Sequence, residues 1–138
     1  MKPIRTFNIL GETLEILVDG SMTGGTSTTM IQTTPSGGGP PPHCHTREDE
    51  TFTVLDGDFE ILSEGEWRKA TVGEIFFAPR GSVHTFRNAG TTTGRIAIFI
   101  SPAGIERFFA DLAGLTPAAD MPRILELFSE YGLSLHHP

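Results

Sequence analysis

Residues 37–57 read GGGPPPHCHTREDETFTVLDG, and they join a loop rich in glycine and proline to two histidines and a strand-forming segment. Side chains two residues apart in a strand project to the same face, so His43 and His45 can direct their imidazoles to one point while Cys44 faces away. Glu50 follows His45 by five residues, which is an odd step. The intervening TRED must therefore bulge or turn if the Glu50 carboxylate is to rejoin that face.

A second stretch, residues 73–88, reads GEIFFAPRGSVHTFRN. It carries His84 just after a turn signal, PRGSV, that would redirect the chain. If the strand of His84 lies beside that of His43 and His45, three imidazoles and the Glu50 carboxylate converge. This donor set suits one divalent transition metal (Fe, Mn, Ni, Co, Cu or Zn) and not the all-oxygen shells of Mg or Ca. The set does not choose among these metals.

The sequence around both stretches, up to about Ile100, consists of short strand-like segments separated by glycine, proline or asparagine. These segments are TLEILVD, STTMIQT, ETFTVLD, DFEILSE, EIFFAP, HTFRN and RIAIFI. Regular spacing of this kind indicates an all-β fold, an antiparallel sandwich or barrel. We expect tight hairpin turns at Asp56-Gly57 and at Glu64-Gly65.

The two stretches resemble the two motifs of the cupin superfamily. The matching residues are Gly37, His43, His45, Glu50 and Gly57 in the first motif, and Gly73, Pro79, Gly81, His84 and Asn88 in the second. The chain is similar to small single-domain, quercetin dioxygenase-like cupins. This resemblance implies a cupin-type antiparallel β-barrel or jelly-roll, a homodimer, and a metal held by the residues at His43, His45, Glu50 and His84.

One register remains open, because Glu48, Asp49 and Glu50 are consecutive acids and a shifted strand could present Glu48 instead. The family spacing selects Glu50, and we expect Glu48 and Asp49 to form a solvated rim. Cys44 is expected to be a packed thiol on the far face, and Asn88 to close a turn with its side-chain amide.

The hydrophobic period changes after Ile100. Ile105, Phe108, Phe109 and Leu112 follow the spacing of an amphipathic helix, with start signals at Ser101 and Pro102 and a stop at Gly114. A second helix is expected from Met121 to about Tyr131, with Asp120 as its cap. We therefore divide the chain into a barrel, residues 1–103, and a helical extension, residues 104–138, that packs on the barrel or on a neighbouring subunit. His136 and His137 are expected to lie in a frayed tail.

The amino-acid composition argues against several classes of protein. The 138 residues hold 17 Asp and Glu against 10 Lys and Arg, a net charge of −7, which argues against nucleic acid as a partner. No apolar run is long enough for a membrane span, and the start MKPIRTFNILGE is too polar for a signal peptide. The single cysteine cannot form an internal disulfide. We expect a cytoplasmic protein with one domain.

Four protein ligands would leave coordination positions for a chelating small-molecule ligand, or for that ligand and dioxygen. Phe52 shares its strand face with Glu50, and Phe86 with His84, so both are expected to line the pocket as substrate-binding residues. The leading hypothesis is a metal-dependent oxygenase for a small chelating aromatic or enolic compound, with Glu50 also acting as a catalytic general base. The alternatives are a non-oxidative isomerase, lyase or decarboxylase, and a ligand-binding protein without turnover.

Overall fold

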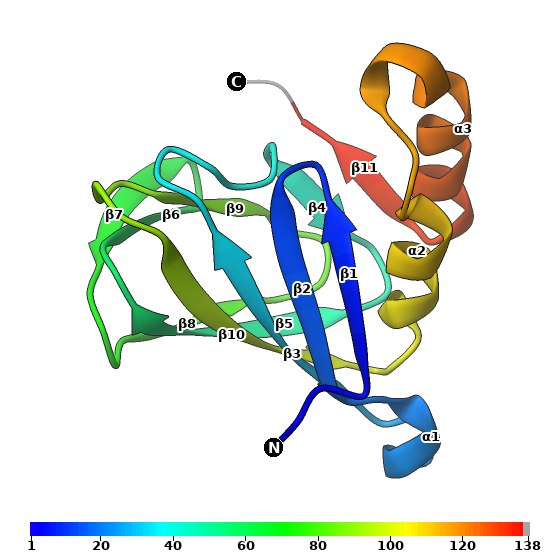
Figure 1. Cartoon of the computed structure of the whole chain (residues 1–138), viewed down its shortest axis with the longest axis horizontal. Helices are drawn as coiled ribbons and strands as arrows, with labels where there is room; N and C mark the ends of the chain where they lie inside the picture. The colour runs from blue at the N-terminus through cyan, green and yellow to red at the C-terminus, as the bar shows by residue number, and fades with distance from the viewer. Residues whose placement is uncertain (137–138) are drawn as a thin grey trace.

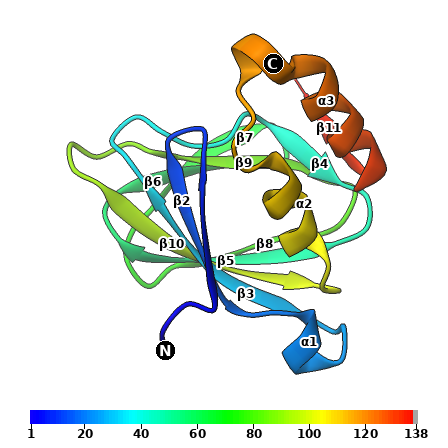
Figure 2. The same cartoon turned by 45° about the vertical axis from the view of Figure 1, so that its right-hand side comes forward.

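The computed structural model describes residues 1–136, and the chain folds into two β-sheets flanked on one side by two helices (Figure 1, Figure 2). The elements, in chain order, are β1 (Arg5–Ile9), β2 (Glu12–Val18), α1 (Gly20–Thr23), β3 (Thr28–Thr34), β4 (His43–His45), β5 (Asp49–Asp56), β6 (Phe59–Ser63), β7 (Glu66–Ala70), β8 (Ile75–Ala78), β9 (Val83–Asn88), β10 (Gly94–Ser101), α2 (Ile105–Leu112), α3 (Pro117–Glu130) and β11 (Leu133–Leu135).

The two sheets are antiparallel and interleaved along the chain. The larger sheet has six strands in the order β1-β2-β3-β10-β5-β8, and the smaller has five in the order β11-β4-β9-β6-β7. Some strands that are neighbours in space are distant in sequence, as where β10 lies between β3 and β5. This crossover pattern is that of a jelly-roll. The all-β, jelly-roll prediction is confirmed.

The hydrophobic core lies between the sheets. Side chains alternate along each strand, so β10 buries Ile96, Ile98 and Ile100 and exposes the residues between them more fully. Across the larger sheet, Ile98 pairs with Met30 on β3 and with Phe52 on β5. The smaller sheet contributes buried residues from β6 and β9, namely Phe59, Ile61 and Phe86.

Of the two predicted hairpin turns, the structure contains one. Glu64-Gly65 joins the paired strands β6 and β7, and both residues have positive φ (52° and 78°), as a two-residue hairpin requires. The prediction for Asp56-Gly57 is wrong, because β5 and β6 belong to different sheets. A short glycine turn suits a corner between sheets as well as a hairpin. The partners decide between the two, and here β10 pairs with β5 while β9 pairs with β6.

Helix α2 lies between the predicted start and stop signals. It buries Ile105, Phe108 and Leu112 of the predicted face, whereas Phe109 is half-buried. Helix α3 begins earlier than predicted, at Pro117, because the Thr116 side chain caps its first turn by accepting from the Ala119 amide. Asp120 is not the cap. Its backbone is non-helical (φ −125°, ψ 15°) and interrupts the helix, and its carboxylate accepts from the Thr116 amide upstream.

The helical extension lies against the β-structure of the same chain (Figure 2). After α3, the chain adds β11 to the edge of the smaller sheet beside β4, a strand that the sequence pattern did not indicate. The amide of His136 then donates to the Pro42 carbonyl (2.9 Å), so the tail is not frayed at His136, and His137 lies outside the described residues. Within residues 1–136, no helix is long and apolar enough to cross a membrane.

Candidate metal centre

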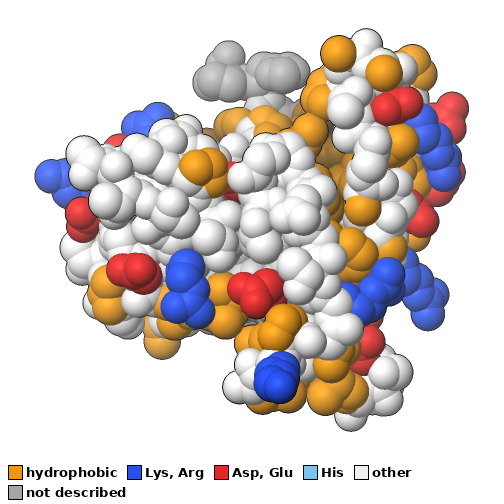
Figure 3. All heavy atoms as spheres, in the orientation of Figure 1, with side chains coloured by type: hydrophobic (Ala, Val, Ile, Leu, Met, Phe, Trp, Pro, Cys, Tyr) orange, Lys and Arg blue, Asp and Glu red, His pale blue; other side chains and the backbone are white. Residues whose placement is uncertain are grey.

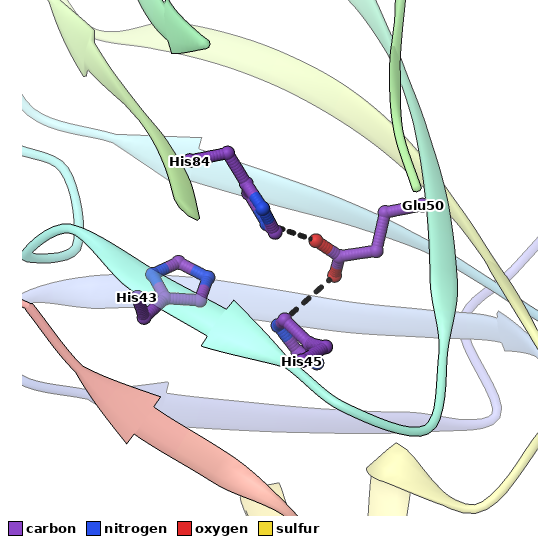
Figure 4. Close-up of side chains that lie close together, drawn as sticks. All are labelled: His43, His45, Glu50 and His84. Carbon is purple, nitrogen blue, oxygen red and sulfur yellow. Dashed lines mark hydrogen bonds and ion pairs between the residues drawn. The ribbon is translucent and has the colours of Figure 1, made fainter. Parts of the chain in front are cut away.

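Four side chains from three strands meet inside the barrel. His43 and His45 lie on β4, and His84 lies on β9 directly opposite His43 in the antiparallel pairing. One potential ligand atom from each of these histidines and from Glu50 lies within 4.8 Å of the others (Figure 4). The predicted neighbouring position of His84 is thus present in the structure, and so is the convergence of the four residues.

Glu50 reaches the cluster from the other sheet. Strand β4 ends at His45, residues 46–48 cross to the larger sheet, and β5 begins at Asp49. The turn demanded by the odd spacing is therefore a crossing between sheets. It is held by the C-terminal segment, since the Thr46 amide and hydroxyl both donate to the Gly132 carbonyl (2.9 and 2.7 Å).

Each imidazole is oriented through its Nδ1 atom. Nδ1 of His43 donates to the Pro41 carbonyl (2.7 Å), and Nδ1 of His84 donates to the Ser82 carbonyl (3.1 Å). Nδ1 of His45 lies 3.2 Å from Oε1 of Glu48. Outer acceptors of this kind fix the tautomer and ring orientation of metal-binding histidines. The Nε2 atom of each of the three imidazoles therefore faces the cluster and is the atom that could bind a metal.

Glu48 corrects the sequence prediction. It was expected at a solvated rim, but it is 6% exposed and bonded to His45, because the crossing of residues 46–48 carries it beneath the imidazole. Asp49, in contrast, is only half-buried, and it pairs with Arg80 (3.1 Å). The consecutive acids thus divide their roles, with Glu50 in the cluster and Glu48 supporting it.

Electrostatics at the centre favour a bound cation. Oε2 of Glu50 lies 2.6 Å from Nε2 of His84, and Oε1 lies 3.5 Å from Nε2 of His45. Burial opposes ionisation of Glu50, but the charge of His45 and the hydrogen bond from His84 outweigh it and lower its pKa. The contact between His84 and Glu50 is a hydrogen bond in which Nε2 carries the proton, since Nδ1 donates outward. A metal ion can take the place of that proton among the same atoms, so the donor set fits a transition metal.

The histidines are not equivalent. Burial, with a smaller contribution from His84, lowers the pKa of His43 to about 4, so this imidazole stays neutral and is ready to act as a ligand. Burial also acts to lower the pKa of His45, but the Glu50 charge and the Glu48 hydrogen bond outweigh it, and the net shift is upward.

The cluster opens into an apolar cavity of about 280 Å³, a size near the lower end of small-molecule sites. Phe52 and Phe86 line this cavity, as their strand faces predicted, and their ring centroids lie 5.8 Å apart. Cys44 is buried and does not line the cavity, in agreement with its predicted orientation. Asn88 donates to the Thr34 and Thr92 carbonyls and accepts from the Gly90 amide, so it closes a turn as expected.

Sequence reasoning missed much of the cavity wall. The helical extension supplies apolar lining from both helices and β11, including Phe108, Phe109, Phe128, Leu133 and Leu135. Figure 3 shows hydrophobic side chains gathered along this helical side of the molecule (right). The strands add two polar lining residues, Glu12 and Gln32. The alternating pattern of ETLEILV marks Glu12 as inward-facing, and this signal could have identified it.

The sequence matches a family model and a curated relative. A sequence model described as "Cupin domain" matches residues 30–101. A putative germin-like protein 3-2 from Oryza sativa subsp. japonica is 32% identical over 99 residues, which are 67% of this chain and 45% of the relative. The chain thus spans less than half of that relative's length.

Two solved structures share the fold at low identity. KdgF from Halomonas sp. aligns with a TM-score of 0.67 and 21% identity, over 78% of this chain and 97% of that one. A cupin-superfamily sugar phosphate isomerase from Silicibacter pomeroyi aligns with a TM-score of 0.59 and 18% identity, over 66% and 59% of the two chains. The matched family model covers both histidine motifs and most of the barrel. The chain therefore belongs to the cupin family.

Proposed function

We propose that His43, His45, Glu50 and His84 bind one divalent transition metal and that the protein is a metal-dependent oxygenase for a small chelating aromatic or enolic compound. The observation that carries this proposal is the convergence of four donors, each imidazole oriented through Nδ1, at the wall of an apolar cavity. The identity of the metal is left open, because the donor set suits several.

The cavity wall indicates the substrate class. Among the described residues, no lysine or arginine lines the cavity, and its polar lining consists of Glu12, Gln32, His43, His45 and Glu50. A phosphate or dicarboxylate would find no cationic side chain apart from the centre itself. An apolar ring with two neighbouring oxygens suits both the walls and the metal site better.

Individual residues have different roles in the proposed reaction. Glu50, kept ionised by its neighbours, is placed to accept the proton of an enol or phenol hydroxyl. Phe52 and Phe86 would hold an aromatic ring by edge and face contacts, and the helices would exclude water. A bound metal would supply Lewis acidity to the resulting oxyanion and a redox partner for dioxygen.

Metal analysis coupled to an oxygen electrode tests this proposal. Protein reconstituted with Fe, Mn, Ni, Co, Cu or Zn should hold about one equivalent per chain, and one of these forms should consume one dioxygen per substrate, retaining both atoms in product, in a screen of catechols, flavonols and diketones. Cys44→Ser is the control variant, because its thiol does not line the cavity. Metal binding without oxygen uptake would contradict the oxygenase assignment.

A non-oxidative isomerase, lyase or decarboxylase is the second candidate, favoured by the presence of a sugar phosphate isomerase among the structural neighbours. Anaerobic incubation separates the candidates, since product formed without dioxygen requires only Lewis-acid chemistry. A ligand that saturates the metal form and is recovered unchanged would instead indicate a binding protein.

We also propose that the protein is a homodimer formed through the outer face of the larger sheet. Ile75 and Phe77 on the edge strand β8 and Phe99 on β10 are 67%, 59% and 47% exposed. The residue that joins Phe77 to Phe99 across β5 is Thr51, so this row is uncharged. A second copy would cover both the row and the edge. Phe77→Glu should convert the dimer to a monomer in light scattering, whereas Trp67→Glu, in the other sheet, should not.

A further inference from the structure

A second polar site lies in the same cavity, away from the metal centre. Glu12, the first residue of β2, lines the cavity and is 8% exposed. Oε1 accepts two hydrogen bonds, from the Gln32 amide (2.9 Å) and from the Thr34 hydroxyl (2.8 Å). No described residue donates to Oε2. Half of this buried carboxyl group is therefore available to a ligand.

The strand register places Glu12 at the opposite end of the sheet's inner face from Glu50. Glu50 pairs with Ile100, which pairs with Thr28 at the start of β3, whereas Glu12 is bonded to Thr34 at the end of β3. Six residue steps of strand separate Thr28 from Thr34, roughly 20 Å at about 3.3 Å per step. Apart from Gln32, which is bonded to Glu12, the cavity-lining residues of the inner face between these ends are apolar, and they include Leu14, Met30, Phe52 and Ile98.

The loop beside Glu12 packs closely against one side of the carboxyl group, so a ligand would reach Oε2 from the cavity. Gly38 lies next to the carboxyl group, and a Cβ atom at this position would stand 3.1 Å from Oε2. Burial raises the pKa of Glu12 despite the hydrogen bonds from Gln32 and Thr34 that act to lower it. A group of this kind is suited to exchange hydrogen bonds with a neutral hydroxyl, and it disfavours an anionic ligand group.

We propose that Glu12 is a specificity-determining residue that hydrogen-bonds, through Oε2, a hydroxyl group at the end of the substrate remote from its metal-chelating oxygens. The substrate class is then an elongated apolar compound with a chelating head and a distal hydroxyl. This inference rests on the proposed metal and substrate site, and it adds a recognition element that the family match, limited to residues 30–101, does not contain.

Pairs of catechols that differ only in a terminal hydroxyl group test this proposal. The metal-loaded protein is titrated anaerobically, by calorimetry, with 4-(ω-hydroxyalkyl)catechols carrying tethers of three to seven carbons and with the matched n-alkylcatechols. At the tether length that spans the cavity, the hydroxyl compound should bind about tenfold more tightly than its alkyl partner, because the alkyl group would bury Oε2 without a partner. Equal affinities at every length in the wild-type protein would overturn the proposal.

Two variants locate the preference. Glu12→Leu should reduce the hydroxyl preference to less than about twofold and leave metal content unchanged. Glu15→Leu is the matched control, because Glu15 lies on the same strand with its side chain on the outer face, and it should keep the preference. A preference that survives in Glu12→Leu would also overturn the proposal. Binding of the alkylcatechols shows that the chelating site itself operates, and failure of every catechol would remove that site and this inference together.

Discussion

The candidate metal centre and the helical cover build one cavity by different means. The centre consists of four polar side chains. The pairing of their strands positions the histidines, and an acceptor at Nδ1 orients each imidazole. The cover, formed by α2, α3 and β11, contributes apolar contacts and no ligand atom of the centre. Metal affinity should therefore be independent of the apolar side chains of α2 and α3, whereas ligand affinity should depend on both regions. Within the cover, β11 is the exception, because it pairs with the strand that carries His43 and His45. Substitutions in each region test whether the two contributions are separate.

The largest effect is expected from removing one donor. His84→Ala deletes an imidazole that also contacts Glu50 (2.6 Å), so metal affinity should fall by more than about a hundredfold. Elemental analysis after dialysis measures the bound metal. Cys44→Ser, on the same pair of strands but outside the cavity, should retain the metal content of the wild type. Loss of metal from the cysteine variant instead would mean that the strand faces are assigned wrongly.

The centre should also carry a pH dependence that the cover lacks. Because the pKa of His43 is lowered from 6.5 to about 4, the unfolded chain binds this proton first as the pH falls. Acid between about pH 6.5 and pH 4 should therefore reduce the free energy of unfolding of the metal-free protein, by about 2 to 3 kcal/mol from this residue.

Urea unfolding of the wild type and of His43→Gln at a series of pH values isolates this contribution, since all other titrating groups are common to both proteins. The wild-type curve should be the steeper of the two in that interval. Parallel curves would show that His43 does not titrate as its burial requires. A variant of the cover, such as Phe128→Ala, should keep the wild-type pH dependence.

Glu48 tests the support of the centre separately from its ligands. Glu48→Ala removes the acceptor of the His45 Nδ1 proton, and metal affinity should fall about tenfold while the cavity stays intact. Competition with a chromophoric chelator measures the affinity. Glu48→Gln should lose less, because its amide oxygen can still accept this hydrogen bond. An unchanged affinity in Glu48→Ala would indicate that the ring orientation of His45 is fixed by strand pairing alone.

Most residues of the centre could be predicted from the sequence, because they lie on strands whose side chains alternate between two faces. Alternation placed His43 and His45 on one face and gave Phe52 and Phe86 their orientation, and the motif spacing selected Glu50 and His84. The buried position of Glu48 depends on how residues 46–48 cross between the sheets, which a local pattern does not contain.

The cover was less predictable for a related reason. The hydrophobic periodicity located α2, but the pairing of β11 with β4 depends on contacts between residues far apart in the sequence, and no local pattern indicated the kink at Asp120. Asp56-Gly57 failed likewise, because long-range pairing put its flanking strands in different sheets. Local patterns therefore identified faces reliably, and they identified partners only where a motif linked distant segments.

The smallest effect is expected from trimming the cover. Phe128 lines the cavity and packs edge-to-face on Phe108 (5.2 Å between centroids), so Phe128→Ala should weaken binding of 4-propylcatechol to the metal-loaded protein by about fivefold, through lost apolar contact. Metal content should not change. Leu125→Ala is the matched control on the same helix, because Leu125 is 50% exposed and lies outside the cavity, and it should leave both quantities unaltered. A loss of metal from Phe128→Ala would show that the cover also holds the centre in shape, and the proposed separation of the two regions would fail.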